Sequence, residues 1–189
     1  MFAKSNLTTT GLAANESDYG DYFAWGAKEP WYLSISGDTF TWKPDHSSGY
    51  ASGTAPAFSP EYTSEKDFEM SDDPARKILG SDWQIPTKAI WEALNTSSYK
   101  WTWTTKKNKN GMEVKNNSTI NSIFLPAAGY VRAKNFSERG SGARYWSGTA
   151  YSSLNAYRLS FSDSKLNVKH DLARQYGCSV RPVRLVAVD

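Results

Sequence analysis

The sequence predicts an α+β domain with few helices and many short strands, and three observations carry this prediction. The chain has 189 residues, which suffices for one domain with a hydrophobic core and is short for two. Only two stretches show helical character, and turn residues separate the remaining segments, which are short and strand-like. From Arg144 onward the pattern is almost wholly that of strands. We therefore expect one domain over residues 1–189, with two short helices packed on small antiparallel sheets and long irregular loops.

The two expected helices are short and have clear start signals. Acidic residues precede Pro74 at the first helical position, and Gly80 can end this helix. The carboxylates of Asp72 and Asp73 suit the positive end of a helix dipole, which favours capping over acid–base catalysis for this pair. The second helix is expected to begin after Thr87, a typical N-cap residue, with its apolar side chains facing inward.

Strands are expected on both sides of a hairpin turn and again near the middle of the chain. The alternation in 101–104 is typical of a half-buried strand, and Asn110-Gly111 is a turn signal that leads into a second strand. The segment 123–130 is a buried apolar run that contains one proline. The segment 43–67, rich in Ser, Gly, Pro and Ala, is expected to be a long surface loop.

The C-terminal third contains a strand with two different faces. Because successive side chains of a strand point to opposite sides, one set is expected inside and the other outside. The inward set is Tyr157, Leu159 and Phe161, and the outward set is Ala156, Arg158, Ser160 and Ser162. The segment 169–176 is expected to be a loop beside the outward set, and a mostly buried strand near 179–186 closes the domain.

Charge and cysteine content exclude several classes of function. The net charge is +3 with acidic and basic residues interspersed, and the one dense basic run, 106–109, is expected at a solvated hairpin tip, so nucleic-acid binding is not expected. A single cysteine, Cys178, excludes an intramolecular disulfide and a Cys-rich zinc site. The sequence has no long apolar run and no signal-peptide pattern, so no membrane insertion is expected, and a leader or anchor upstream of Met1 is left open.

The residues needed for common enzymatic chemistry are largely missing. The sequence has no Gly-x-Ser-x-Gly elbow, no phosphate-binding glycine loop with lysine, and no His-Glu-x-x-His. Its two histidines, His46 and His170, provide little material for a metal site or a catalytic triad, and Cys178 has no obvious base. We therefore expect a protein that is not an enzyme and has no catalytic residues, no cofactor and no metal site.

Five phrases of the sequence occur together in an order that is more specific than any single motif. They are residues 18–26 (Asp-Tyr-Gly-Asp-Tyr-Phe-Ala-Trp-Gly), 83–87 (Trp-Gln-Ile-Pro-Thr), 123–130 (Ile-Phe-Leu-Pro-Ala-Ala-Gly-Tyr), 145–149 (Tyr-Trp-Ser-Gly-Thr) and 177–183 (Gly-Cys-Ser-Val-Arg-Pro-Val). In order and spacing they resemble the Fibrobacter succinogenes major paralogous domain, a family common in Bacteroides-type bacteria and their phages. The resemblance spans about residues 18–186 and implies a C-type lectin-like fold of the formylglycine-generating-enzyme branch.

A second resemblance concerns the stretch that ends in Arg-Gln-Tyr-Gly-Cys-Ser-Val-Arg-Pro-Val at 174–183. It is similar to the variable region of proteins diversified by bacterial and phage diversity-generating retroelements. This implies a scaffold over about 18–147, a variable ligand-binding region over about 148–178 and a closing strand over 179–186. The ligand-binding positions that it implies are Leu154, Arg158, Ser160, Ser162, Asp163, Ser164, Leu166, His170, Asp171, Leu172, Ala173, Tyr176 and Cys178.

The resemblance implies a display protein that binds a protein or glycan, with a location at a cell or virion surface favoured over the cytoplasm. Departures from relatives matter here: the only Glu-Pro is Glu29-Pro30, Trp-Asn-Asp is missing, and one cysteine cannot supply a catalytic pair. Calcium-dependent sugar binding and formylglycine chemistry are thus not implied. Two alternatives stay open, namely a surface or pilus-associated structural or adhesin module without diversification, and an enzyme of the same fold. The ligand and the oligomeric state are left open.

Overall fold

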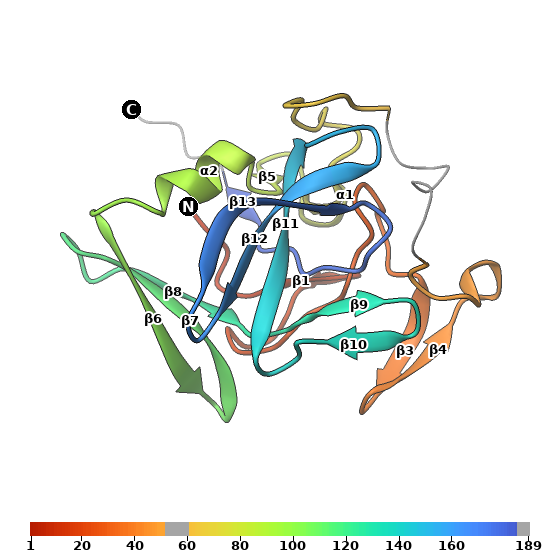
Figure 1. The fold of residues 1–189 in the computed structure, drawn as a ribbon, viewed down its shortest axis with the longest axis horizontal. Helices are drawn as coiled ribbons and strands as arrows, with labels where there is room; N and C mark the ends of the chain where they lie inside the picture. The colour runs from red at the N-terminus through yellow and green to blue at the C-terminus, as the bar shows by residue number, and fades with distance from the viewer. Residues whose placement is uncertain (52–60, 185–189) are drawn as a thin grey trace.

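The computed structural model describes residues 1–51 and 61–184 and contains two α-helices and one 3-10 helix within that part (Figure 1). The helices are α1 (Pro74–Leu79), α2 (Lys88–Ala93) and the 3-10 helix Pro44–His46. The first eight strands are β1 (Leu7–Thr8), β2 (Gly11–Leu12), β3 (Tyr32–Ser36), β4 (Thr39–Trp42), β5 (Trp83–Gln84), β6 (Tyr99–Lys106), β7 (Lys109–Asn116) and β8 (Ser122–Pro126). The last six are β9 (Tyr130–Arg132), β10 (Asn135–Ser137), β11 (Gly142–Ala150), β12 (Asn155–Ser162), β13 (Leu166–Ala173) and β14 (Val183–Arg184).

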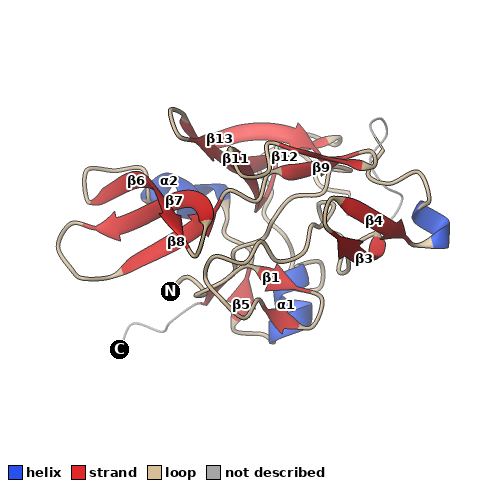
Figure 2. Cartoon of the chain, turned by 90° about the horizontal axis from the view of Figure 1, so that it is seen from below, coloured by secondary structure: helices blue, strands red, loops and turns tan. Residues whose placement is uncertain are grey.

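The strands of the described part form six small sheets with antiparallel pairing. The two larger sheets have the orders β6-β7-β8 and β11-β12-β13, and the others are the pairs β1-β2, β3-β4, β9-β10 and β5-β14. Figures 1 and 2 show β6–β8 and β3–β4 at opposite ends of the molecule, with β11–β13 between them. Few helices and many small antiparallel sheets confirm the α+β class predicted from the sequence. None of the helices within the described ranges is long and apolar enough to cross a membrane.

Both predicted helices form, and local capping explains where they begin. The side chain of Asp73 accepts hydrogen bonds from the backbone N–H groups of Ala75 and Arg76 at the start of α1. Thr87 caps α2 in the same way through Ile90 N–H. Asp73 also accepts from Ile85 N–H, and burial raises the pKa of its carboxyl. The interpretation of this aspartate as a capping residue is confirmed.

The predicted hairpin also forms with the basic run 106–109 at its tip, as expected, but Asn110-Gly111 is not its turn. Lys106 pairs with Lys109, so the two-residue turn is Lys107-Asn108, and both residues have positive φ (47° and 61°). Gly111 instead pairs with Thr104 inside β7. A Cβ on Gly111 would lie 2.4 Å from the carbonyl oxygen of Leu125, so this glycine permits close approach of β8 and does not make the turn.

Three clusters of buried apolar side chains fill the interior, and β11 separates two of them. The first cluster contains Trp25 and Trp146, and the second contains Trp91 and Tyr145, so neighbouring residues of β11 point into different clusters. The third is built on the N-terminal segment and β3–β4 around Tyr50. Because both of its faces are packed, β11 is a central, rigid support for the strands beside it.

Segments near the two ends of the described chain are joined to each other. Phe2 forms a bridge with Val183, and Phe23 forms another with Cys178. The expected closing strand 179–186 is shorter in the structure, where β14 covers Val183–Arg184, and residues 185–186 lie outside the described part. Part of the loop expected over 43–67 also lies outside it, and the described remainder contains the 3-10 helix.

Candidate ligand-binding face

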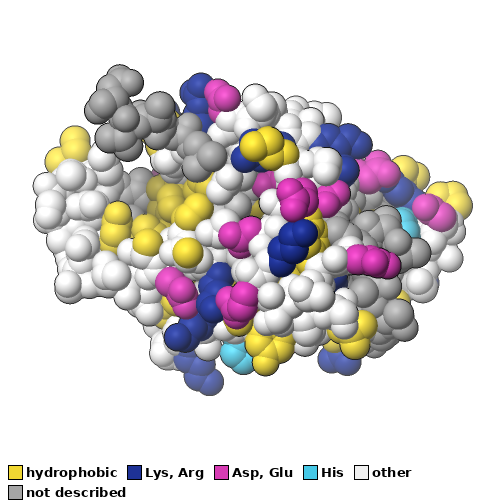
Figure 3. Space-filling model, turned by 90° about the horizontal axis from the view of Figure 1, so that it is seen from above, with side chains coloured by type: hydrophobic (Ala, Val, Ile, Leu, Met, Phe, Trp, Pro, Cys, Tyr) yellow, Lys and Arg dark blue, Asp and Glu magenta, His cyan; other side chains and the backbone are white. Residues whose placement is uncertain are grey.

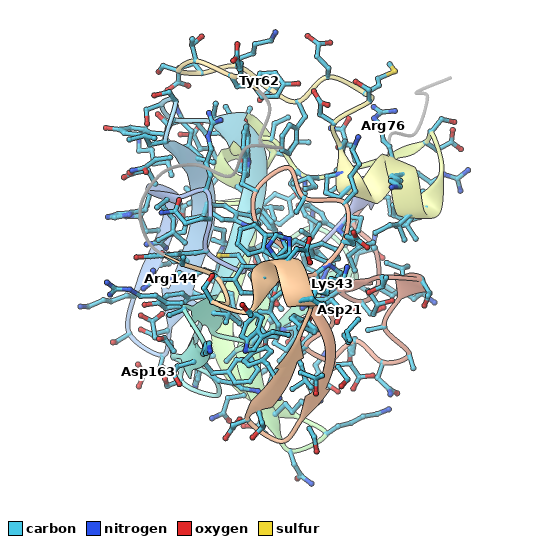
Figure 4. The ribbon with its side chains drawn as sticks, turned by 90° about the vertical axis from the view of Figure 1, so that its right-hand side faces the viewer. Asp21, Lys43, Tyr62, Arg76, Arg144 and Asp163 are labelled. Carbon is cyan, nitrogen blue, oxygen red and sulfur yellow. The ribbon has the colours of Figure 1, made fainter. Side chains whose placement is uncertain are left out.

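The candidate site is one side of the β11–β12–β13 sheet, which we call the outer face. Direct cross-strand partners share a side of a sheet, and the register pairs Arg144 with Ser160, Ser160 with Asn167, and Arg158 with His170. The opposite side carries Leu159, which is fully buried in the second cluster. In Figure 4, Arg144 and Asp163 lie along the edge of the molecule where these strands run.

One end of the outer face is covered by the protein interior and the other is open. Trp146, Ala156 and Leu172 belong to the first buried cluster and close the covered end. At the open end Asn167 and His170 are exposed. The covered end gives the sheet a fixed position, and the open end provides the accessible surface.

The thirteen predicted ligand-binding positions fall into three groups by burial. The exposed positions are Leu154, Asp163, Ser164 and His170. The half-buried positions are Ser160, Ser162, Leu166, Asp171, Ala173 and Tyr176. The buried positions are Arg158, Leu172 and Cys178. Burial of Arg158 corrects the expectation that it emerges on the outward face together with Ser160 and Ser162.

Each buried position has a physical reason. Leu172 pairs with Ala156 at the covered end of the face, so both side chains pack in the first cluster, although Ala156 was expected to face outward. Cys178 exchanges backbone hydrogen bonds with Phe23 and is fully buried, which raises the pKa of its thiol to about 12. Arg158 lies between Trp146 and His170 in the register and is only 6% exposed.

The segment 169–176 is not the loop that the sequence suggested. Its first five residues belong to β13, which runs Leu166–Ala173 and pairs with β12 along its whole length. A bulge shifts the pairing, because Arg158 faces His170 but Ser160 faces Asn167, which leaves one extra residue in β13. The polar residues of this segment are therefore held in a sheet.

The structure brings some of the predicted residues together and separates others. Arg158 and His170 are in contact, and Ser160 is two residues further along the same face. Leu154 lies beyond one end of β12 and Asp163 beyond the other, separated by roughly 26 Å of strand. Asp171 pairs with Tyr157 on the other side of the sheet, where it accepts a hydrogen bond of 2.6 Å from Asn155.

Arg144 lies near Arg158 on the outer face and contacts an aromatic pair. Arg144 forms a 2.8 Å ion pair with Glu138, and its guanidinium lies 3.5 Å from the ring centroid of Tyr130. Tyr130 stacks on Tyr176 at 6.1 Å. Burial, and secondarily the charge of Arg144, lowers the pKa of Arg158 to about 10, so its guanidinium remains charged at neutral pH.

Sequence reasoning missed Arg144, Tyr130 and Arg132, whose guanidinium lies 5.7 Å from the Tyr176 ring. Arg144 and Tyr130 flank recognisable phrases of the sequence, but nothing local shows that they meet. Gly129 bridges to Ala143, and this long-range pairing brings the two segments together. Only the strand register could have identified these residues.

A hollow of about 510 Å³ lies between β3 and residues 18–22, away from the outer face. Its charged side chains already have partners, since Arg139 pairs with Asp38 at 2.7 Å and Lys109 lies 3.3 Å from an oxygen of Asp18. Asp21 accepts a hydrogen bond of 2.7 Å from the Tyr32 hydroxyl. The groups in this hollow satisfy one another, which makes it a weaker candidate than the outer face.

Two further observations concern charge and metal ligands. On the side of the molecule seen in Figure 3, acidic and basic side chains of the described residues are interspersed. Within residues 1–51 and 61–184, no group of three or more His, Cys, Asp or Glu side chains is placed to hold a metal ion.

Comparison with known proteins gives one match. A family model described as "Domain of unknown function (DUF8237)" matches residues 100–183, which is less than half of the 189-residue chain. The matched region runs from β6 to the start of β14 and includes all thirteen predicted positions. No curated protein and no solved structure matches the chain.

Proposed function

We propose that this chain is a ligand-binding domain of C-type lectin-like fold, which presents the open end of the outer face to a protein or glycan. The observation that carries the proposal is the division of one sheet face into two parts. One part is packed on the first buried cluster, whereas the other exposes side chains of different chemistry, including Asn167 and His170. A rigid support beneath an accessible, chemically mixed surface is what a recognition site requires.

The proposal includes diversification by a retroelement. Ten of the thirteen positions remain after the buried Arg158, Leu172 and Cys178 are removed, and these ten are exposed or half-buried. Such positions tolerate exchange of side chains, because a residue that meets mainly water changes stability by only about 0.5 kcal/mol when it is replaced. The three buried positions would restrict exchange to residues that the interior accepts.

Binding can be tested with a matched pair of tryptophan substitutions. Asn167→Trp places a large ring on the open end of the outer face, and Thr102→Trp places the same ring on an exposed position of β6. The probes are an array of printed glycans and a panel of intact bacterial cells, read with fluorescently labelled protein. We expect the Asn167 variant to lose about tenfold or more of the bound signal and the Thr102 variant to retain it, in line with the energy of a central contact. Equal binding by both variants would move the ligand surface elsewhere.

Diversification has an independent test in the gene's surroundings. A retroelement requires a reverse transcriptase gene nearby and a near-copy of the 3′ end of this gene in which asparagine codons occupy the varied positions. Finding both would support diversification at positions such as Ser160 and His170. Their absence would contradict diversification. The binding proposal would then still be tested by the two tryptophan variants.

A further inference from the structure

Three arginines are buried among the described residues, and one of them differs from the others in its hydrogen bonds. Arg181 donates to the Asn6 side chain at 2.8 Å and to the carbonyls of Lys4 and Phe124 at 2.7 and 2.8 Å. Arg174 donates to two carbonyls, at 2.8 and 2.6 Å. In Arg158 the atoms Nε and Nη1 are buried and have no hydrogen-bond partner. Buried polar groups without a partner are rare in proteins, so the Arg158 guanidinium differs from the other two.

Among the described residues the Arg158 guanidinium has one hydrogen-bond contact, to His170, and this contact does not satisfy it. Nη2 of Arg158 lies 3.3 Å from Nδ1 of His170, and the same Nδ1 lies 3.0 Å from the carbonyl oxygen of Asp171. If Nδ1 carries a proton it donates to the carbonyl and faces Arg158 as a second donor. If it carries none, it accepts from Arg158 and faces the carbonyl as a second acceptor. Only one of the two contacts can therefore be a hydrogen bond.

A second observation concerns the charge of Arg158. Within the described ranges Arg158 forms no ion pair, and the nearby carboxylate of Glu138 is already bound to Arg144. Arg144 itself has a buried Nε without a partner. The carboxylate of Asp171 also acts electrostatically on Arg158, but it accepts its hydrogen bond from Asn155 on the other side of the sheet. The guanidinium of Arg158 is therefore buried without a directly bound counterion, which is costly for a charged group.

We propose that Arg158, together with Arg144, binds a carboxylate group of the ligand on the outer face. This inference rests on the proposed function and names the chemical group that the face recognises. A carboxylate has two oxygens in one plane, which match two parallel N–H donors of a guanidinium, and its negative charge gives Arg158 a directly bound counterion. Ser160, half-buried next to Arg158 and opposite Arg144, offers a hydroxyl beside the bound group.

Access to Arg158 depends on His170. The side chain of His170 is 56% exposed, whereas that of Arg144 is 15% exposed, so the histidine is the freer of the two. Rotation of the imidazole away from Nη2 loses at most one weak hydrogen bond, which a carboxylate oxygen replaces with a stronger, charge-assisted one. The Tyr130 ring holds Arg144 from the other side and limits its movement.

The test is a titration of the whole protein with sodium acetate, sodium glucuronate and N-acetylglutamate, with sodium chloride at equal ionic strength as the reference. The readout is the NMR signal of the arginine Nε–Hε groups, with the Arg158 signal assigned by its loss in Arg158→Met. We expect a saturable shift of this signal with the carboxylates. Neither chloride nor glucose, which serves as an uncharged control, should shift it. The tighter of glucuronate and N-acetylglutamate identifies the source of the carboxylate, a sugar acid or an acidic peptide side chain.

Two variants make the test specific. Arg158→Met keeps the length of the side chain and removes its charge, and it should weaken carboxylate binding about tenfold or more, since hydrogen bonds to charged groups are among the stronger ones. Arg132→Met removes an exposed arginine that lies over Tyr176 on the same side, and it should change the affinity by less than about twofold.

Several outcomes would overturn the inference. They are an Arg158 signal that does not move, a shift that chloride reproduces, or unchanged affinity in Arg158→Met. If Arg158→Met does not fold, Arg158→Lys, which keeps the charge and lacks the Nε–Hε group, supplies the assignment, and the wild-type titration then decides. Loss of glycan or cell binding in Asn167→Trp without any carboxylate shift would reject this inference and keep the proposed function. A carboxylate shift without any loss of binding in Asn167→Trp would reject the proposed function and keep the site.

Discussion

At the scale of single residues, the buried arginines show how the same side chain can have opposite effects on stability. Arg181 is fully buried and donates to groups from the N-terminal segment and from β8. The guanidinium therefore joins the segment that contains Arg181 to two other parts of the chain. The pKa of Arg181 is lowered by burial, but its donors are satisfied by carbonyl and amide oxygens.

Removing the Arg181 guanidinium should strongly destabilise the fold. Arg181→Met leaves the Asn6 side chain and the carbonyls of Lys4 and Phe124 without their donor in the interior. We expect a loss of about 3–5 kcal/mol in the free energy of unfolding, measured by urea denaturation. Arg158→Met is the matched control and should be neutral or stabilising, because no protein group loses a good partner. Equal losses in both variants would contradict this difference.

Burial of Cys178 makes stability depend on pH in the alkaline range. Its pKa is raised from 9.0 to about 12 in the folded protein, chiefly by desolvation. Above pH 9 the unfolded thiol loses its proton while the folded one keeps it, so the unfolded state binds fewer protons and stability falls as pH rises. The decline attributable to this one thiol should approach about 1.4 kcal/mol per pH unit and be complete near the folded pKa.

Urea unfolding of the wild type and Cys178→Ala at pH 8, 9, 10 and 11 checks this expectation. The alanine variant should lose stability less steeply, because the contribution of the thiol is removed while those of other groups remain; Tyr145, whose pKa burial raises from 10.0 to about 12, is one of these groups. Parallel pH dependence in the two proteins would mean that the thiol is accessible in the folded state.

At the scale of secondary-structure elements, local signals were predictable and non-local ones were not. Both helices could be placed because their start depends on adjacent residues such as Asp73 and Thr87. The hairpin was predicted correctly, but Gly111 was taken for a turn residue. The close approach of β8 explains why a glycine stands at this position. Simple alternation along the strand predicted the outer face. In the structure, the bulge in β13 shifts the pairing, and Leu172 packs in the first cluster and does not face outward.

The position of the hairpin turn predicts that a glycine introduced at 108 stabilises the protein and that the loss of the glycine at 111 destabilises it. Replacing Lys107-Asn108 by Asn-Gly should stabilise the protein by about 0.5–1 kcal/mol, because both positions have positive φ and form a tight turn. Gly111→Ala should cost about 1–3 kcal/mol, because its Cβ would collide with the Leu125 carbonyl and the Phe124 ring. Thermal unfolding of the two variants measures both effects. A tolerated Gly111→Ala would contradict the close strand approach.

The division of the outer face predicts where substitution is tolerated. Replacing Ser160, Ser162, Ser164 and His170 together by alanine should cost less than about 2 kcal/mol, since each meets water at least in part. Leu172→Ala should cost about 2–5 kcal/mol, because this side chain packs in the first cluster. Urea midpoints of the two variants provide the comparison. A quadruple variant as unstable as the leucine variant would show that the open end belongs to the interior.

At the scale of the whole molecule, the segments that build the outer face depend on residues far away in the sequence. The indole Nε1–H of Trp146 donates to the Phe23 carbonyl at 2.7 Å, and that of Trp25 donates to the Ser147 carbonyl at 2.8 Å. The backbone N–H of Trp25 also donates to the carbonyl oxygen of Arg174 at 2.7 Å. The N-terminal segment therefore packs against the sheet that carries the proposed ligand-binding face and completes its support.

This dependence predicts that the region 100–183, which the family model matches, does not fold by itself. Isolated, it lacks Trp25 and the Asn6 side chain, so the first cluster is open and Arg181 loses a partner in the interior. The same links predict that the full chain unfolds in one transition, because neither part has a complete core. Near-UV and far-UV circular dichroism of the full chain should therefore change at the same temperature, whereas the isolated region should show no near-UV signal. A folded isolated region, or two separate transitions in the full chain, would show that the C-terminal sheet is an independent unit and that its face needs no N-terminal support.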